Sequence, residues 1–247
     1  MFPSGPSPIR LDAAPPPRLL VSVRDALEAD LAAARGADIV DAKDPDDGPL
    51  GALPVGTVSA IVSATAGRAA TSAVAGDGEG GLPVSVAAVA AAGVDYVKIA
   101  ASPALLADAG ALRRIAAAAP GRLVAVLLAE DAAESGIPPE GLATLAASGF
   151  AGAMLDTRGK TGRRLGDILD PATLRGFVAA CRSSGLISGL AGSLRVGDVT
   201  GLGALGPAYL GFRGGLCRDG DRRRALDPAR VSEAAAALRA LRRRDAA

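Results

Sequence analysis

The chain has 247 residues with 49% hydrophobic content, enough for one large core, and its formal net charge of +1 excludes an overall field that would draw it to DNA or a membrane. Aromatic residues make up only 2% of the chain, which removes the base-stacking platforms of single-stranded nucleic-acid binding, so we expect a small-molecule partner. The absence of histidine excludes the Ser-His triad and the commonest zinc ligand, and leaves proton transfer to Lys, Asp, Glu, Tyr or Cys.

The first 17 residues are rich in proline and are expected to form a disordered extension. They lack the basic start and apolar stretch of a signal peptide, and the chain has no run of about twenty apolar residues that would span a membrane. Cys181 and Cys217 lie far apart without a CxxC pattern, which is typical of a reducing cytoplasm. Residues 18–247 are expected to form a single catalytic domain.

From Arg18 onward, short apolar runs alternate with alanine-rich helical stretches, which is the signature of a parallel sheet with helices outside it. About eight such units are present, and this number predicts a (β/α)₈ TIM barrel, of class α/β. The expected strands cover residues 18–23, 37–43, 70–76, 95–100, 122–130, 151–157, 186–193 and 208–214. A doubly wound sheet is the alternative, but LLVSVRDALEA lacks the GxGxxG turn that normally follows its first strand.

Capping residues predict the bounds of several helices between these strands. Asp25 can cap a helix over 26–35, and a second helix begins near Ser102 and closes at 120–121. Asp170 and Pro171 open a third, while the last one begins at the Asp227 and Pro228 pair.

Charged residues close several of the expected strands, which is where the active site of a barrel lies. The second strand closes with Asp41 and Lys43, two residues apart and so on the same side of the strand. The fourth carries Lys98, the sixth ends with Asp156, and Lys160 follows in the next loop. We expect these five side chains to converge on the mouth of the barrel as catalytic residues, with no metal.

Such a cluster favours imine chemistry, because neighbouring cations and burial lower the pKa of an amine toward the range that imine formation requires. Lys43 is the expected imine-forming nucleophile, and an adjacent carboxylate can move the protons. The alternatives are structural: Lys43 could pair with Asp41 or Asp44, Lys98 could pair with Asp95 or another carboxylate, and Asp156 could cap the loop that follows it.

Glycines follow the last two strands, at the position where barrels often hold a phosphate. Backbone N–H groups could grip the anion, and Arg213 could add charge; the candidate phosphate-binding residues are Gly192, Ser193, Arg213, Gly214 and Gly215. The alternative is that these glycines only make tight turns. DPDDG (44–48) is interpreted as a turn rather than a calcium loop, and GDGEGG (76–81) as a mobile loop that could serve as a lid.

Several segments together carry a resemblance, and in order they are RLLVSVRDALEADLAAARGADIVDAKDPDDGPLGA, DYVKIA, AMLDTRGKTG, LAGS and GFRGGLC. They resemble the (5-formylfuran-3-yl)methyl phosphate synthase family of methanofuran biosynthesis, over nearly the whole chain from residue 18 to about 240. The resemblance implies a (β/α)₈ barrel that condenses two molecules of glyceraldehyde 3-phosphate with loss of one phosphate and water. It also implies that no metal or organic cofactor is needed.

On the matching positions, the resemblance makes Lys43 the Schiff-base residue and Lys98 the proton acceptor, with Asp41, Asp156 and Lys160 in the accompanying motifs. The stretch ATSAVAGDGEGG matches the family loosely, and the proline-rich extension is not part of the family core. A class I aldolase or sugar-phosphate isomerase, and a non-catalytic phosphometabolite-binding protein, are the alternative functions. The partner is expected to be a triose phosphate, and the chain a possible homo-oligomer.

Overall fold

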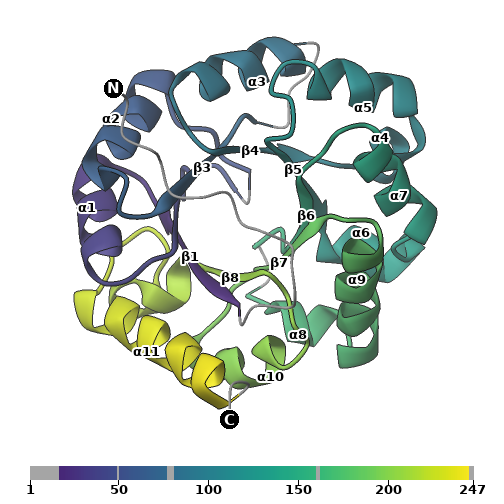
Figure 1. Cartoon of the computed structure of the whole chain (residues 1–247). Coiled ribbons are helices and arrows are strands. Elements are labelled where there is room, and N and C mark those ends of the chain that lie inside the picture. The colour runs from purple at the N-terminus through teal and green to yellow at the C-terminus, as the bar shows by residue number, and fades with distance from the viewer. Residues whose placement is uncertain (1–16, 49, 77–80, 160–161, 245–247) are drawn as a thin grey trace.

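The computed structural model describes residues 17–244 apart from 49, 77–80 and 160–161, so the expected disorder of the extension falls outside the described residues except at residue 17. Eight parallel strands close into a barrel in chain order (Figure 1). They are β1 (Arg18–Val23), β2 (Ile39–Ala42), β3 (Ala70–Val74), β4 (Tyr96–Ala100), β5 (Leu123–Leu128), β6 (Gly152–Asp156), β7 (Ile187–Leu190) and β8 (Tyr209–Phe212). The predicted TIM barrel is confirmed.

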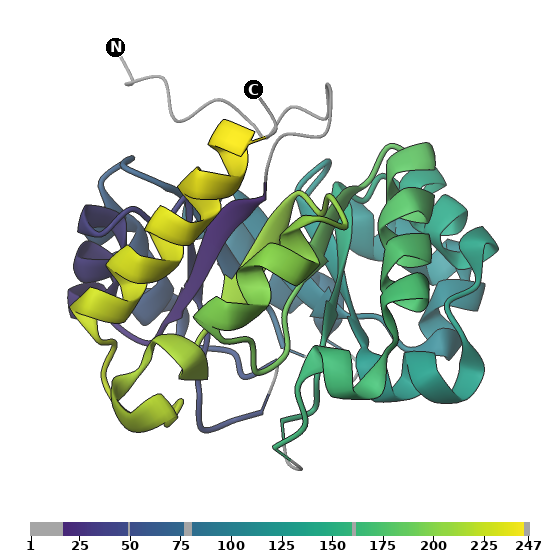
Figure 2. The ribbon, with the colours of Figure 1, turned by 90° about the horizontal axis from the view of Figure 1, so that it is seen from below.

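Helices surround the strands and form the outer layer, as the view along the barrel and the side view both show (Figures 1 and 2). They are α1 (Ala26–Ala34), α2 (Val55–Thr65), α3 (Leu82–Ala91), α4 (Pro103–Ala107), α5 (Ala109–Ala116), α6 (Ala129–Ser135), α7 (Pro139–Ala147), α8 (Leu165–Ile168), α9 (Pro171–Ser183), α10 (Val199–Gly203) and α11 (Pro228–Arg244). Within the described residues, no helix combines the length and the apolar character that crossing a membrane requires.

The strands divide the core into two layers, because successive side chains of a strand point to opposite faces. Outward side chains such as Leu19 and Val21 pack against the helices in the larger cluster. Inward side chains such as Leu20, Met154 and Tyr209 fill the barrel interior in the smaller one. Both faces of each strand are therefore buried, which explains the near-continuous apolar runs in the sequence.

A glycine makes room for the largest side chain inside the barrel. A Cβ atom added to Gly189 of β7 would lie 2.2 to 2.5 Å from three atoms of the Tyr209 side chain on the neighbouring strand β8. The aromatic ring of Tyr209 therefore occupies the space that a side chain at position 189 would fill. This packing closes the interior beneath the polar residues at the strand ends.

We expect Gly189→Ala to lower the free energy of unfolding by about 1–3 kcal/mol, since overpacking must shift the Tyr209 ring or the strand. The matched control is Gly176→Ala in α9, where an added Cβ would meet nothing within 4 Å. That change should raise the free energy of unfolding by about 0.5–1 kcal/mol through helix propensity. Urea unfolding of both variants measures the difference, and equal stabilities would contradict the packing argument.

Several predicted bounds were wrong at strand ends and in one helix. The fifth strand ends at Leu128 because α6 begins at Ala129, and the helix expected from Ser102 to residue 120 is two helices. It breaks at Asp108, whose carboxylate accepts a hydrogen bond from the amide of Ala111 and so caps α5. The caps that Asp25 and Asp170 were predicted to provide are confirmed.

Candidate active site

A pocket of about 960 Å³ opens at the carboxyl ends of the strands. Its lining comes from the strands, from the loops after β2, β6, β7 and β8, and from the start of α11, in keeping with the place of active sites in this fold. Lys43, Lys98 and Asp156 all line it, so the structure brings these predicted residues together. Lys160 and most of the 76–81 loop fall outside the described residues, so their predicted roles stay predictions.

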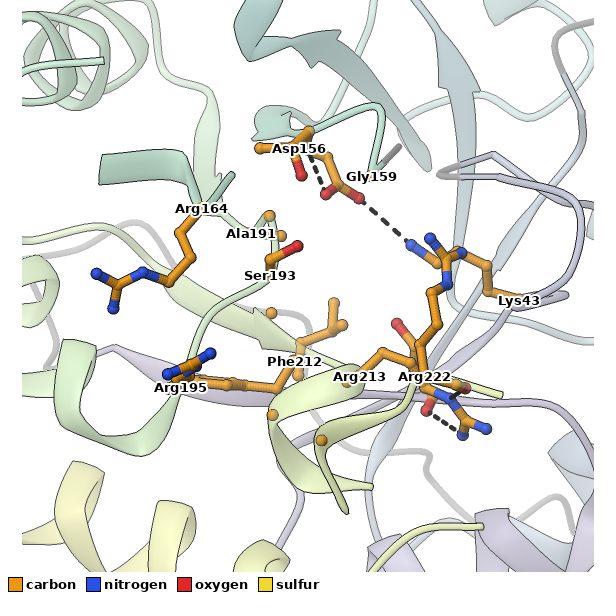
Figure 3. A pocket seen from close by; sticks show the side chains of 18 of the residues that line it. Lys43, Asp156, Gly159, Arg164, Ala191, Ser193, Arg195, Phe212, Arg213 and Arg222 are labelled. Carbon is orange, nitrogen blue, oxygen red and sulfur yellow. Dashed lines mark hydrogen bonds and ion pairs between the residues drawn. The ribbon is translucent and has the colours of Figure 1, made fainter. Parts of the chain in front are cut away.

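Lys43 forms an ion pair across the mouth of the barrel. Its Nζ atom lies 3.3 Å from Oδ2 of Asp156, a contact drawn as a dashed line in Figure 3. Lys43 directly follows β2 and Asp156 ends β6, and these strands are four apart in a ring of eight. The side chain of Lys43 is 10% exposed, so its amine is largely desolvated yet borders the pocket.

Lys98 forms a second ion pair deeper in the barrel. Its Nζ lies 2.6 Å from Oδ1 of Asp41, and both side chains are almost fully buried. The hydroxyl groups of Ser22 and Ser72 also donate to this carboxylate, over 2.9 and 2.6 Å. Strand register places Asp41 opposite both serines, and three donors thus fix its two oxygens. The sequence offered a signal for Ser22, which is an isolated polar residue in a buried strand, but a weaker one for Ser72, which follows Thr71.

Burial lowers the pKa of the Lys98 amine from its ordinary range. The Asp41 carboxylate opposes this effect, whereas the positive charge of Lys43 adds to it. Two lysines therefore influence one another in the same pocket, as the clustering of charges in the sequence indicated. A lysine with a lowered pKa can hold its neutral form, which accepts a proton, at a lower pH than a free lysine can.

The partner of Lys43 differs from those that its alternative named, whereas Lys98 does pair with a carboxylate other than Asp95, as its alternative allowed. Lys43 pairs with Asp156 and not with Asp41 or Asp44, and Lys98 pairs with Asp41 and not with Asp95. Asp156 does also accept a hydrogen bond from the amide of Thr157, so it holds the start of its loop as well as Lys43. Residues 44–48 form a turn in which the Asp44 side chain accepts from the amide of Asp46, as predicted.

The loops after β7 and β8 meet at the glycines predicted to bind phosphate. A Cβ added to Gly215 would lie 2.1 Å from the carbonyl oxygen of Leu194, so only glycine permits this contact. Gly192 and Ser193 have φ angles of 114° and 52°, which turn the chain sharply after β7 and end that strand early. Within the described part of the chain, no carbonyl accepts the amide N–H of Ser193 or Gly214, so both remain available to an anion.

Arg213 lines the pocket, but its guanidinium group is committed to the protein. It forms a buried ion pair with Glu28 of α1 and donates to the carbonyl oxygens of Ser22, Arg222 and Arg224. Its charge is therefore balanced by Glu28 in this structure. Arg213 orders the loop after β8 that carries Gly214 and Gly215, and any contact with phosphate would compete with this network.

Sequence reasoning missed four arginines of the pocket, Arg164, Arg195, Arg222 and Arg230. Figure 3 shows Arg164 and Arg195 near Ser193, on the side of the pocket opposite Lys43. Arg195 follows the predicted LAGS element by two residues, which is the signal that could have identified it. Arg222 lies in a charged run after β8, where a sequence offers no means of separating pocket from surface.

Lysine is rare in this chain: 24 of its 27 basic residues are arginine, and the three lysines are Lys43, Lys98 and Lys160. Both lysines that the structure describes line the pocket. Surface ion pairs in the described residues use arginine throughout. Since an ammonium group can become a nucleophile and a guanidinium group cannot, this distribution favours a chemical role for the amines. In the part of the chain described, no three or more Cys, Asp or Glu residues group as a metal site.

Comparisons with known proteins agree with this geometry. The model of the 4-HFC-P synthase family matches residues 19–235. A protein of Methylorubrum extorquens, provisionally named a (5-formylfuran-3-yl)methyl phosphate synthase, is 56% identical over 232 residues, covering 94% of this chain and 95% of that protein. The synthase of that name from Methanopyrus kandleri is 34% identical over 221 residues, covering 84% and 92%.

Among solved structures, 3-hexulose-6-phosphate synthase from Salmonella typhimurium superposes with a TM-score of 0.64 at 16% identity, over 90% of this chain and 99% of that one. Phosphoribosyl anthranilate isomerase from Thermus thermophilus gives the same TM-score and identity, over 91% and 99%. At such low identity these matches show a shared barrel fold alone.

Proposed function

The chain belongs to the 4-HFC-P synthase family, and from this membership we propose that it condenses two molecules of glyceraldehyde 3-phosphate into (5-formylfuran-3-yl)methyl phosphate, a carbon-oxygen lyase reaction. The reaction releases one phosphate and two molecules of water. The observation that carries the proposal is the Lys43 amine, which borders the pocket and is paired with Asp156, beside a second lysine of lowered pKa.

Lys43 is better placed than Lys98 to form the imine. Lys98 is 3% exposed and is held by Asp41 at 2.6 Å, whereas Lys43 borders the open pocket with a longer contact to Asp156. The Lys43 amine adds to the aldehyde carbon, and loss of one water gives the imine. Asp156 takes a proton from the attacking amine and returns it to the departing oxygen.

Lys98 then acts as the base. The protonated imine draws electrons from the neighbouring carbon, and the neutral Lys98 amine takes the proton that this carbon loses, which gives the enamine. The enamine carbon attacks the aldehyde of the second triose phosphate, and elimination of phosphate and water with ring closure gives the furan. Asp41, fixed by Ser22 and Ser72, holds the Lys98 side chain in place throughout.

The test is product analysis after incubation with glyceraldehyde 3-phosphate. We expect a conjugated aldehyde that absorbs in the near ultraviolet, and inorganic phosphate in equal amount. An aldolase would make a sugar bisphosphate without releasing phosphate, and an isomerase would make the ketose phosphate. A non-catalytic binding protein would leave the substrate unchanged. Any of these three results would overturn the proposal.

The lowered pKa of Lys98 sets the expected pH dependence. Only the neutral amine accepts a proton, so the rate at saturating substrate should rise with pH and reach a plateau below the range near 10.4 where a free lysine titrates. In Lys98→Arg the base stays protonated, so this rise should disappear and the rate should be low at every pH. Rates measured from pH 6 to 10 on both proteins decide the point, and an identical rise in the variant would exclude Lys98.

A further inference from the structure

Seven basic residues among those described line the pocket, and carboxylates neutralise most of them. They are Lys43, Lys98, Arg164, Arg195, Arg213, Arg222 and Arg230. Five lie within 4 Å of a carboxylate oxygen. In the described ranges, the two without such a partner are Arg195 and Arg222, and Figure 3 shows Arg222 on the side of Lys43 and Arg195 on the side of Ser193. The uncompensated positive charge is therefore divided between two places.

Arg222 lies across the mouth of the pocket. It belongs to the loop after β8, yet its Nη2 donates to the carbonyl oxygen of Gly48 in the loop after β2, over 2.6 Å. Its Nη1 packs on Gly159 in the loop after β6, where an added Cβ would lie 2.9 Å away. Its Nε is buried and has no hydrogen-bond partner in the described structure. A buried donor without a partner is costly, and an anion in the pocket would remove that cost.

The two loops that Arg222 contacts follow the strands that carry the Lys43 and Asp156 pair. Gly48 lies five residues after Lys43, and Gly159 lies three residues after Asp156. The guanidinium group of Arg222 thus contacts the loops after β2 and β6, the two strands whose ends carry Lys43 and Asp156. In a triose phosphate only two carbons and an ester oxygen separate the aldehyde carbon from phosphorus, so an aldehyde bound to Lys43 carries its phosphate to the nearby rim.

We propose that Arg222 binds the phosphate of the triose phosphate attached to Lys43, in a subsite separate from the rim formed by Ser193 and Arg195. This subsite rests on the proposed function, because it assigns one anion position to each of the two substrate molecules. One N–H of Nη2 holds the guanidinium on the loop after β2, and its other N–H lies beside the N–H of Nε on one edge of the group, so that the two form a two-point donor for the phosphate oxygens.

The experiment compares two aldehydes at Lys43 by borohydride trapping and mass spectrometry. Glyceraldehyde 3-phosphate and glyceraldehyde differ only in the phosphate, so the ratio of their trapping rates measures how strongly the phosphate is recognised. We expect Arg222→Gln to lower this ratio by about 10- to 100-fold, chiefly by slowing the phosphorylated aldehyde. A purely structural role would slow both aldehydes alike and leave the ratio unchanged, which overturns the proposal.

Arg223→Gln is the matched control, since Arg223 is the next residue, its side chain is 70% exposed, and it pairs with Asp46 on the surface. This control should keep the wild-type ratio; a drop equal to that of Arg222→Gln would mean that the ratio reports loop damage, and would also overturn the proposal.

A wild-type protein that traps neither aldehyde would refute the imine mechanism, and inorganic phosphate then tests the subsite alone. Phosphate raises the melting temperature of a protein that binds it in the folded state. A smaller rise in Arg222→Gln than in Arg223→Gln supports the subsite, and equal rises overturn it.

Discussion

Lys43→Ala should form no borohydride-trapped adduct with glyceraldehyde 3-phosphate, and its furan aldehyde formation should fall by about 10³-fold or more. In the proposed mechanism Lys43 supplies the nitrogen of the imine, and its loss removes the electron sink on which both the enamine and the new carbon-carbon bond depend. Removing the amine also leaves Asp156 without its partner, so this variant alone does not separate chemistry from structure.

The variant Lys43→Arg separates the loss of chemistry from the loss of the ion pair. A guanidinium group keeps the positive charge beside Asp156 but cannot form the imine, so the variant should unfold at nearly the wild-type denaturant concentration and yet form no adduct. Tryptic mapping identifies the modified lysine, because each of the three lies in a different arginine-bounded peptide, at 36–68, 69–113 and 159–163. An adduct in the 69–113 peptide, or full turnover by Lys43→Ala, would refute the assignment.

The second large effect concerns stability. Asp41→Asn should lower the free energy of unfolding by about 3–5 kcal/mol at neutral pH, because it leaves Lys98 buried without its countercharge. Asp41→Asn combined with Lys98→Met removes both charges and should regain most of that loss while staying inactive. Urea unfolding of the two single variants and the double variant gives the coupling free energy of the pair.

The pH dependence of Asp41→Asn follows from the same pair. Asp41 raises the pKa of Lys98, so its removal lowers that pKa further. The folded state then binds fewer protons than the unfolded state from the lowered value up to the ordinary lysine range, and stability rises with pH across this window. The loss in Asp41→Asn should therefore shrink at high pH, whereas a loss independent of pH would contradict an unpaired Lys98 charge.

The sequence predicts well which charged side chains share the pocket, because the carboxyl ends of barrel strands always meet at one face. Each apolar run that closes on a charged residue marks such an end, which is how Lys43, Lys98 and Asp156 could be placed in one pocket. Strand ends were predicted less well after β7, where the positive φ angles of Gly192 and Ser193 stop the strand. Backbone conformation of that kind depends on contacts with a neighbouring loop.

The pairing of charges could not be predicted, because it depends on which strands face each other across the ring. Lys43 lies beside two aspartates in the sequence, and its partner Asp156 is 113 residues away. The different roles of Arg213 and Arg222 could not be predicted from the sequence for a similar reason. Both are arginines in the loop after β8, but only contacts with α1 and the loop after β2 show which of them is neutralised.

The two lysine-aspartate pairs also affect the selectivity of the pocket between ligands of similar size. Deep in the barrel the charges cancel in pairs, and among the described residues that line the pocket the basic side chains without a carboxylate partner, Arg195 and Arg222, lie at the rim. We therefore expect a ligand with one neutral end and one anionic end to bind with its anionic end at the rim. We expect a three-carbon phosphate with a carboxylate in place of its aldehyde to bind more weakly, because its second charge would lose water beside a lysine that Asp156 already neutralises.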